Sequence, residues 1–150
     1  MKYDVYADLF VALDLRVFEF VSIGKYGSIT KRIAFMPTEM PFVYNLAFGD
    51  VNEDDEINDF SISDNGDRNK VLATLAKVID LYTDKYPERL IYFRGSTKER
   101  TRLYRMAVGL NLEELSEKFE IYAEVEDNLE FLPFHKNMQI IAFLIKRKIV

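Results

Sequence analysis

The longest periodic pattern in this sequence is helical, and it lies between two segments that have the pattern of short strands. Apolar residues recur at helical spacing from Val71 to Tyr86, and Pro87 ends the run. We predict strands on either side of it, at Phe60–Ser63 and Arg89–Arg94. Because a helical crossover joins parallel strands, this order predicts a central β-α-β unit.

The segment before this unit has the pattern of antiparallel strands. Val17–Ile23 and Ile29–Met36 are rich in β-branched and aromatic residues, and Gly24-Lys25-Tyr26-Gly27 between them predicts a hairpin turn. Tyr44–Phe48 alternates again and predicts a third strand. An acidic loop is expected over Asp50–Asp59.

Further helices and strands are expected after the crossover. Ser96 and Glu99 have the spacing of a capping box, which predicts a second helix ending at Gly109. A short third helix is expected after Asn111, and strands near 121–125 and 139–147 complete the chain. The sequence therefore predicts an α+β fold, with a mixed, mainly antiparallel sheet, a central β-α-β unit and two to three helices. One globular domain is expected over 1–150.

Composition excludes several classes of function. The chain has no cysteine, which excludes disulfides, thiolate metal sites and cysteine nucleophiles. Its first residues lack the basic start and apolar run of a signal peptide, and its longest apolar stretch is far below the ~20 residues that span a bilayer. We expect a cytoplasmic protein that does not contact membranes, and no cofactor is predicted.

A run of cations lies where the strand ending at Arg94 turns into a helix. It holds five cations and one carboxylate, in a chain whose net charge is -5. The free N–H groups of a helix start, two hydroxyl groups and nearby arginines all favour an anion. The sequence predicts a site for an anionic ligand or an acidic protein surface at Arg94, Gly95, Ser96, Thr97, Lys98, Arg100, Arg102 and Arg105.

A second group of polar residues is expected to lie near this site. If the strands at 60–63 and 89–94 are parallel, both end at the same edge of the sheet, and the loops that follow them become neighbours. The sequence then predicts a crevice between 94–102 and 64–67, flanked by Asp64, Asn65 and Asp67.

Several segments spread over nearly the whole chain have distinctive amino-acid sequences: Phe18–Phe20, Tyr44–Asp50, Asn65–Asp67, Lys70–Thr74 and Gly95–Met106. Together they resemble a family of short uncharacterised proteins from Bacteroidota, which is a family defined only as a domain of unknown function. The resemblance implies a free-standing bacterial protein. It brings no activity, cofactor or catalytic residue with it.

Three functions fit the basic segment, and a binding module is favoured over an enzyme because no nucleophile with a matching base is present. As an enzyme, the chain would use Asp64 or Asp67 with Arg94 and Arg100 on a phosphorylated or carboxylate substrate. Nucleic-acid binding is disfavoured by the sequence pI of about 5.0. Docking on an acidic protein surface would be favoured by a flat helix face instead of a crevice.

No metal site is predicted. Asp50, Asn52 and Asp54 begin like a calcium loop, but Asp55 occupies the position of the turn glycine and Ser61 that of the terminal acid. His135 is the only histidine, so a site with several histidines is excluded.

Overall fold

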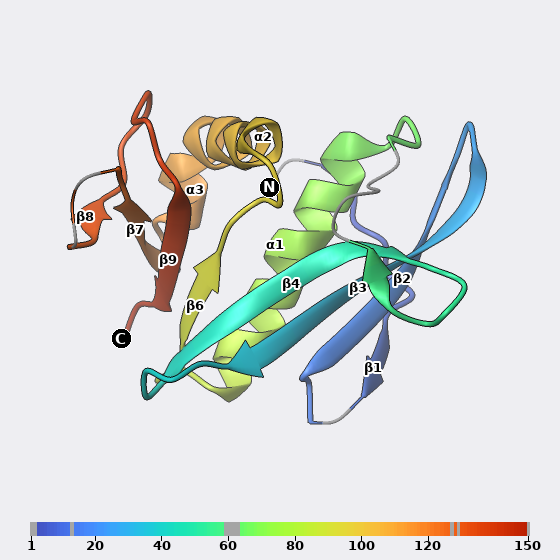
Figure 1. Cartoon of the computed structure of the whole chain (residues 1–150), viewed down its shortest axis with the longest axis horizontal. Coiled ribbons are helices and arrows are strands. Elements are labelled where there is room, and N and C mark those ends of the chain that lie inside the picture. The colour runs from blue at the N-terminus through green and yellow to red at the C-terminus, as the bar shows by residue number, and fades with distance from the viewer. Residues whose placement is uncertain (1–2, 13, 59–63, 127, 129, 150) are drawn as a thin grey trace. The chain divides into compact units, whose positions relative to one another are not determined.

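The computed structural model describes residues 3–12, 14–58, 64–126, 128 and 130–149. These residues form three helices and nine strands (Figure 1). The helices are α1 (Arg68–Lys85), α2 (Lys98–Leu110) and α3 (Leu112–Leu115). The strands are β1 (Phe10–Ala12), β2 (Val17–Gly24), β3 (Gly27–Pro37), β4 (Val43–Val51), β5 (Ile57–Asn58), β6 (Leu90–Phe93), β7 (Phe119–Glu124), β8 (Leu132–Pro133) and β9 (Ala142–Arg147).

The chain divides into two compact units, and β4 contributes residues to both. The first unit consists of Met1–Met36 and Leu46–Tyr82, and the second of Pro37–Asn45 and Thr83–Val150. In the first unit the strands pair in the order β1-β2-β3-β4, with β5 also on β4. In the second unit the order is β4-β6-β9-β7-β8. The expectation of a single domain over 1–150 stays a prediction.

The parallel pair of the sheet is β4 with β6. Val43–Asn45 lie beside Leu90–Tyr92, and the chain passes from β4 to β6 through α1. Most other pairs are antiparallel. The α+β class is therefore confirmed, with a mixed, mainly antiparallel sheet and a β-α-β unit. The strand predicted at 60–63 lies outside the described residues.

The predicted hairpin between β2 and β3 is confirmed. The two strands pair antiparallel from Val17 opposite Ala34 to Gly24 opposite Gly27. Gly27 has a φ of 87°, which is a conformation that glycine adopts without steric cost. The turn of this hairpin therefore depends on the glycine at position 27.

The start of α1 is fastened to this hairpin by a buried amide. Asn65 is 1% exposed, and its Nδ2 donates to the carbonyl of Gly27 at 2.9 Å. Its Oδ1 accepts from the backbone N–H of Tyr26 at 2.7 Å. A Cβ added to Gly24 would lie 1.8 Å from the Asn65 carbonyl oxygen, so only glycine allows this approach.

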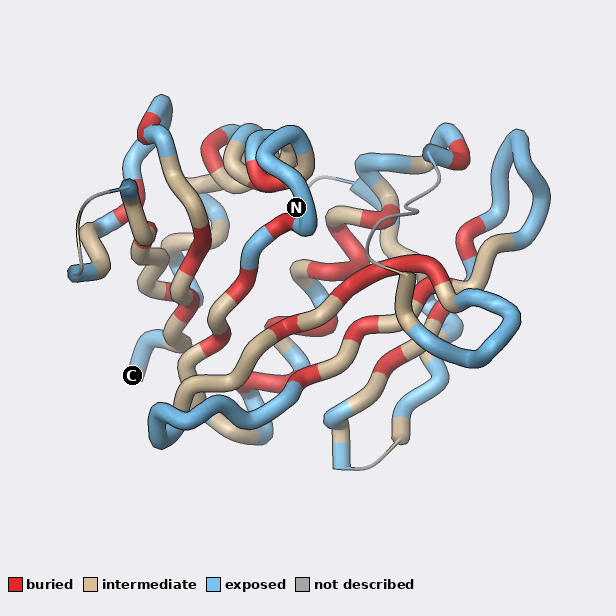
Figure 2. Tube along the Cα trace, viewed as in Figure 1, coloured by how far each residue is buried: buried red, intermediate tan, exposed pale blue. Residues whose placement is uncertain are grey.

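The core of the first unit follows the alternation of its strands, whose buried residues are red in Figure 2. Phe18 and Phe20 of β2 and Ile33 and Phe35 of β3 are at most 2% exposed. α1 covers them with Tyr82, whose ring stacks on Phe35 with 3.7 Å between centroids. The buried face of α1 is the one that the helical spacing predicts.

An ion pair is buried in the same face of β3. Lys31 is 1% exposed, and its Nζ lies 2.6 Å from Oδ1 of Asp50 in β4. The expectation that Asp50 begins a solvated acidic loop is therefore wrong. A buried lysine needs a partner of opposite charge, and Asp50 supplies it.

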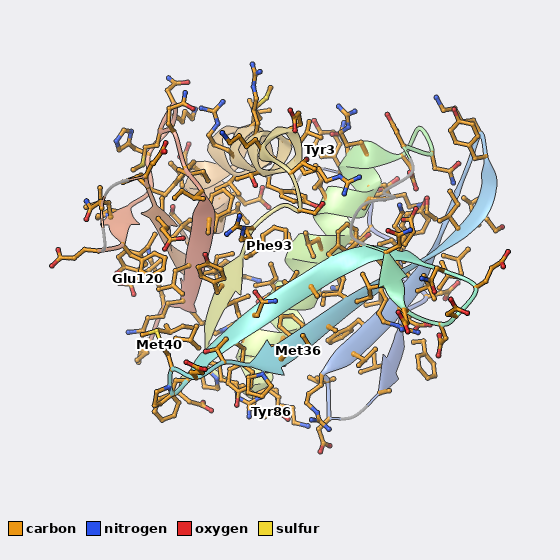
Figure 3. The ribbon with its side chains drawn as sticks, in the orientation of Figure 1. Tyr3, Met36, Met40, Tyr86, Phe93 and Glu120 are labelled. Atoms are coloured by element: carbon orange, nitrogen blue, oxygen red, sulfur yellow. The ribbon has the colours of Figure 1, made fainter. Side chains whose placement is uncertain are left out.

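The second unit has its core around β6 and β9. Ile91, Phe93 and Phe143 are at most 5% exposed. The ring of Phe93, which is labelled in Figure 3, lies 4.6 Å from that of Tyr104 in α2. This contact decides which side of α2 is covered.

The end of α2 differs from the sequence-based expectation. Gly109 was expected to end the helix, but it is buried inside it, and Asn111 is the C-cap residue. A Cβ at Gly109 would lie 3.5 Å from Cγ of Lys136, which is an ordinary contact. Gly109 is therefore packed near the Lys136 side chain. The helix ends two residues later, at Asn111, whose φ and ψ angles are not helical.

We predict that Gly24→Ala lowers the free energy of unfolding by about 3 kcal/mol, because the new methyl group collides with the Asn65 carbonyl. Gly27→Ala is the control. It meets no atom within 4 Å and costs only the positive φ, about 1 kcal/mol. Urea denaturation of both variants tests this, and equal losses would contradict the proposed close approach.

Candidate functional site

The predicted basic site lies on the loop after β6 and on α2. The N-cap residue of α2 is Thr97, whose Oγ1 accepts the backbone N–H of Arg100 at 3.2 Å. The predicted capping box of Ser96 and Glu99 is therefore wrong by one residue. Serine and threonine are both favoured at N-caps, so the sequence does not decide between these two neighbours, and the backbone places Thr97 at the cap.

The turn into α2 is held by Gly95 and Thr101. Gly95 is buried, and its N–H donates to Oγ1 of Thr101 at 3.0 Å. That hydroxyl donates in turn to the carbonyl of Thr97 at 3.2 Å. A Cβ on Gly95 would lie 2.5 Å from the Thr101 nitrogen. The Gly95 N–H is thus used inside the turn.

The predicted hydroxyl groups are also engaged. Nη1 of Arg100 donates to Oγ of Ser96 at 2.5 Å, and Thr97 caps the helix. Three groups that were expected to hold an anion, the Gly95 N–H and these two hydroxyls, therefore have partners within the segment. The geometry here is that of a closed turn rather than of an open phosphate cradle.

The five cations of the segment fall into two groups. Arg94, Lys98 and Arg102 are exposed, whereas Arg100 and Arg105 are partly buried. Nη1 of Arg105 donates to the carbonyl of Met138 at 3.1 Å, which ties α2 to the loop before β9. Arg105 therefore holds α2 against this loop. The exposed positive charge belongs to Arg94, Lys98 and Arg102.

Lys98 and Arg102 make no hydrogen bond or ion pair with any other described residue. Arg94 lies close to the hydroxyl of Tyr92, which donates to Oε1 of Glu124 at 2.8 Å. Burial raises the pKa of Tyr92, the bond to Glu124 raises it further, and Arg94 acts in the opposite direction. The exposed cations available to a partner are Lys98 and Arg102, whereas Arg94 is exposed in the loop before α2 and interacts with Tyr92.

The outer side of α2 also carries apolar residues. Met106 is 50% exposed, and Leu110 is 79% exposed. Thr101 and Tyr104 occupy the buried side. Lys98, Arg102, Met106 and Leu110 are spaced by four residues, so each lies on the same side of the helix as the next one in the series. This spacing was present in the sequence, but it does not reveal which side is covered.

The acidic residues predicted to flank a crevice belong to the loop before α1. Asp64 is exposed, with Oδ1 accepting the Gly66 N–H at 3.0 Å and Oδ2 lying 3.3 Å from Arg68. The Gly66 N–H is the largest cause that lowers the pKa of Asp64, and the nearby charges of Arg68 and Lys25 add to it. Asn65 holds the hairpin, as described above.

Asp67 is engaged by two hydroxyl groups. Its Oδ2 accepts from Oγ of Ser22 at 2.6 Å and from the hydroxyl of Tyr6. Burial and the bond to Asp67 raise the pKa of Tyr6. Asp67 thereby links the N-terminal segment to β2 and to the start of α1. The predicted crevice would join residues of the two units, and it stays a prediction.

The described residues contain no group of three or more histidine, cysteine, aspartate or glutamate side chains that could hold a metal ion. Within the same part of the chain, no helix is long and apolar enough to cross a membrane.

Comparison with known proteins gives one match. The model of a family described as "Family of unknown function (DUF6934)" matches residues 2–148, which is nearly the whole chain. No curated protein and no solved structure matches the sequence. The match shows the family of the chain, and the description of that family assigns no activity.

The cap geometry predicts that Thr97→Ala lowers the free energy of unfolding by about 1 kcal/mol, because the Arg100 N–H loses its acceptor. Ser96→Ala, one residue away, should cost less than about 0.5 kcal/mol, since Ser96 is exposed and does not cap α2. Chemical denaturation compares the two variants. A larger loss for Ser96→Ala would contradict the assignment of the cap.

Proposed function

The chain belongs to the family of unknown function DUF6934, and we propose that it is a non-enzymatic binding protein that docks an acidic protein surface on the outer face of α2. One observation carries the proposal. Lys98 and Arg102 are exposed on one side of a helix and have no partner among the described residues. The chain is acidic overall, with a net charge of -5, so these cations are a local reversal of its charge.

An extended acidic partner is favoured over a small anion. The Gly95 N–H and the hydroxyls of Ser96 and Thr97 already have partners inside the turn, so a small anion would meet mainly exposed cations. One exposed ion pair contributes at most about 1 kcal/mol. A surface with several carboxylates forms several such pairs at once, and its field also steers the encounter.

The enzyme alternative has less support from the contacts of its proposed carboxylates. The lowered pKa of Asp64 makes its carboxylate a weak general base. The same lowered pKa keeps it ionised at neutral pH, so it has no proton to donate as a general acid. Asp67 accepts hydrogen bonds from Tyr6 and Ser22, which give it a role in holding the first unit together. These contacts favour binding as the function of the chain.

The proposal predicts that fluorescently labelled poly-glutamate binds the protein, with an affinity that falls as salt is raised. The double variant Lys98→Ala, Arg102→Ala should bind it about fivefold more weakly, because two exposed ion pairs are lost. Fluorescence anisotropy measures both affinities. Lys77→Ala is the matched control, since Lys77 is exposed on α1 and has no partner among the described residues.

Three outcomes would overturn the proposal. The first is that the double variant and the Lys77→Ala control bind poly-glutamate equally well. The second is that a single-stranded DNA oligonucleotide of the same length binds more tightly than poly-glutamate and depends on Arg94 and Arg102, which would assign the surface to nucleic acid. The third is that sulfate raises the melting temperature more in the wild type than in Arg94→Ala, Arg102→Ala, which would assign a small-anion site in place of the docking surface.

A further inference from the structure

The exposed side of α2 changes character along its length. Lys98 and Arg102 occupy its first half, together with Glu99, and Met106 and Leu110 occupy its second half. The stripe from Lys98 to Leu110 is about 18 Å long, from the rise of an α-helix. Cations alone would suit any anion, but the two apolar side chains call for a partner with an apolar patch of its own.

The turn that follows this stripe carries the opposite charge. α3 begins at Leu112, two residues after Leu110, and Glu113 and Glu114 lie exposed in it. Glu113 makes no hydrogen bond or ion pair with another described residue. Cations, apolar residues and carboxylates therefore follow one another in chain order, and Lys98, Arg102 and Glu113 have no partner among the described residues.

Exposed residues in this chain order can be complementary to those of a second copy of the chain. In a two-fold contact, residue i of one copy meets residue j of the other, and residue j meets residue i. With two α2 helices antiparallel, Arg102 of each copy would lie near Glu113 of the other, and Met106 would lie near Leu110 of the other. The opposed helix dipoles also favour this arrangement.

We infer that the acidic surface that α2 binds is α3 of a second copy of this chain, in a two-fold dimer centred on Met106 and Leu110. The inference rests on the proposed function and names its partner. One helix face and one short turn form a small interface, so the dimer is weak and depends on protein concentration. Salt also weakens it, because its outer contacts are exposed ion pairs.

Sedimentation velocity of the full chain tests the inference. The sedimentation coefficient should rise with protein concentration in low salt, and Leu110→Glu should keep the protein monomeric at concentrations where the wild type associates. Ile149→Glu is the matched control, because Ile149 is 83% exposed and lies outside the stripe. A monomeric wild type at all concentrations, or equal association of the wild type and Leu110→Glu, would overturn the inference.

Charge reversal tests the pairing itself. Arg102→Glu and Glu113→Arg should each weaken self-association, because each puts like charges opposite one another. An equimolar mixture of the two variants should associate at least tenfold more tightly than either alone, since each mixed contact again joins opposite charges. Circular dichroism of each variant verifies that it is folded. A mixture that associates no better than its components would rule out this pairing.

The two proposals fail in different ways. If the chain is monomeric but Lys98 and Arg102 still determine poly-glutamate binding, the dimer is wrong and the acidic partner is another protein. If Leu110→Glu abolishes self-association while poly-glutamate binding is unaffected by Lys98 and Arg102, the acidic-surface function is wrong and the contact is purely apolar.

Discussion

A buried side-chain amide must find its hydrogen-bond partners inside the protein. In the first unit, the arrangement of the chain depends on such an amide, that of Asn65. Asn65 donates to Gly27 and accepts from Tyr26, so the start of α1 and the β2–β3 hairpin are fixed to one another. Leaving one such group unsatisfied costs about 1–3 kcal/mol. The need for glycine at position 24 follows from the same contact.

In the second unit, a side-chain hydroxyl group links two parts of the backbone in a similar way. Oγ1 of Thr101 joins the Gly95 N–H to the Thr97 carbonyl, and Tyr104 packs on Phe93 of β6. These contacts fix the rotation of α2 about its own axis. The cationic and apolar stripe faces outward because Thr101 and Tyr104 face inward. The proposed binding surface is thus a consequence of packing on the opposite side of the helix.

Local patterns predicted much of this fold, and long-range contacts account for most of the rest. The helical spacing of α1 and the two glycines of the hairpin act over a few residues, so the sequence displays them directly. Lys31 and Asp50 lie on different strands, and no spacing rule links them. The guanidinium group of Arg89 likewise lies 4.2 Å from the Tyr44 ring centroid, across β4 and the turn before β6. Very short strands such as β5 and β8 carry too few residues for an alternation to be recognised.

For the candidate site, the position of the basic segment could be predicted from the sequence. Which of its side chains are exposed and which have partners inside the protein could not. The run of cations was visible in the sequence, but the burial of Tyr104 and the exposure of Met106 are seen only in the structure. The central claim is that this outer face is where the chain binds. Mapping amide chemical shifts by NMR during a titration with poly-glutamate tests it most directly. The account predicts that the largest changes fall within 98–110, whereas largest changes at 64–67, or none in α2, would contradict it.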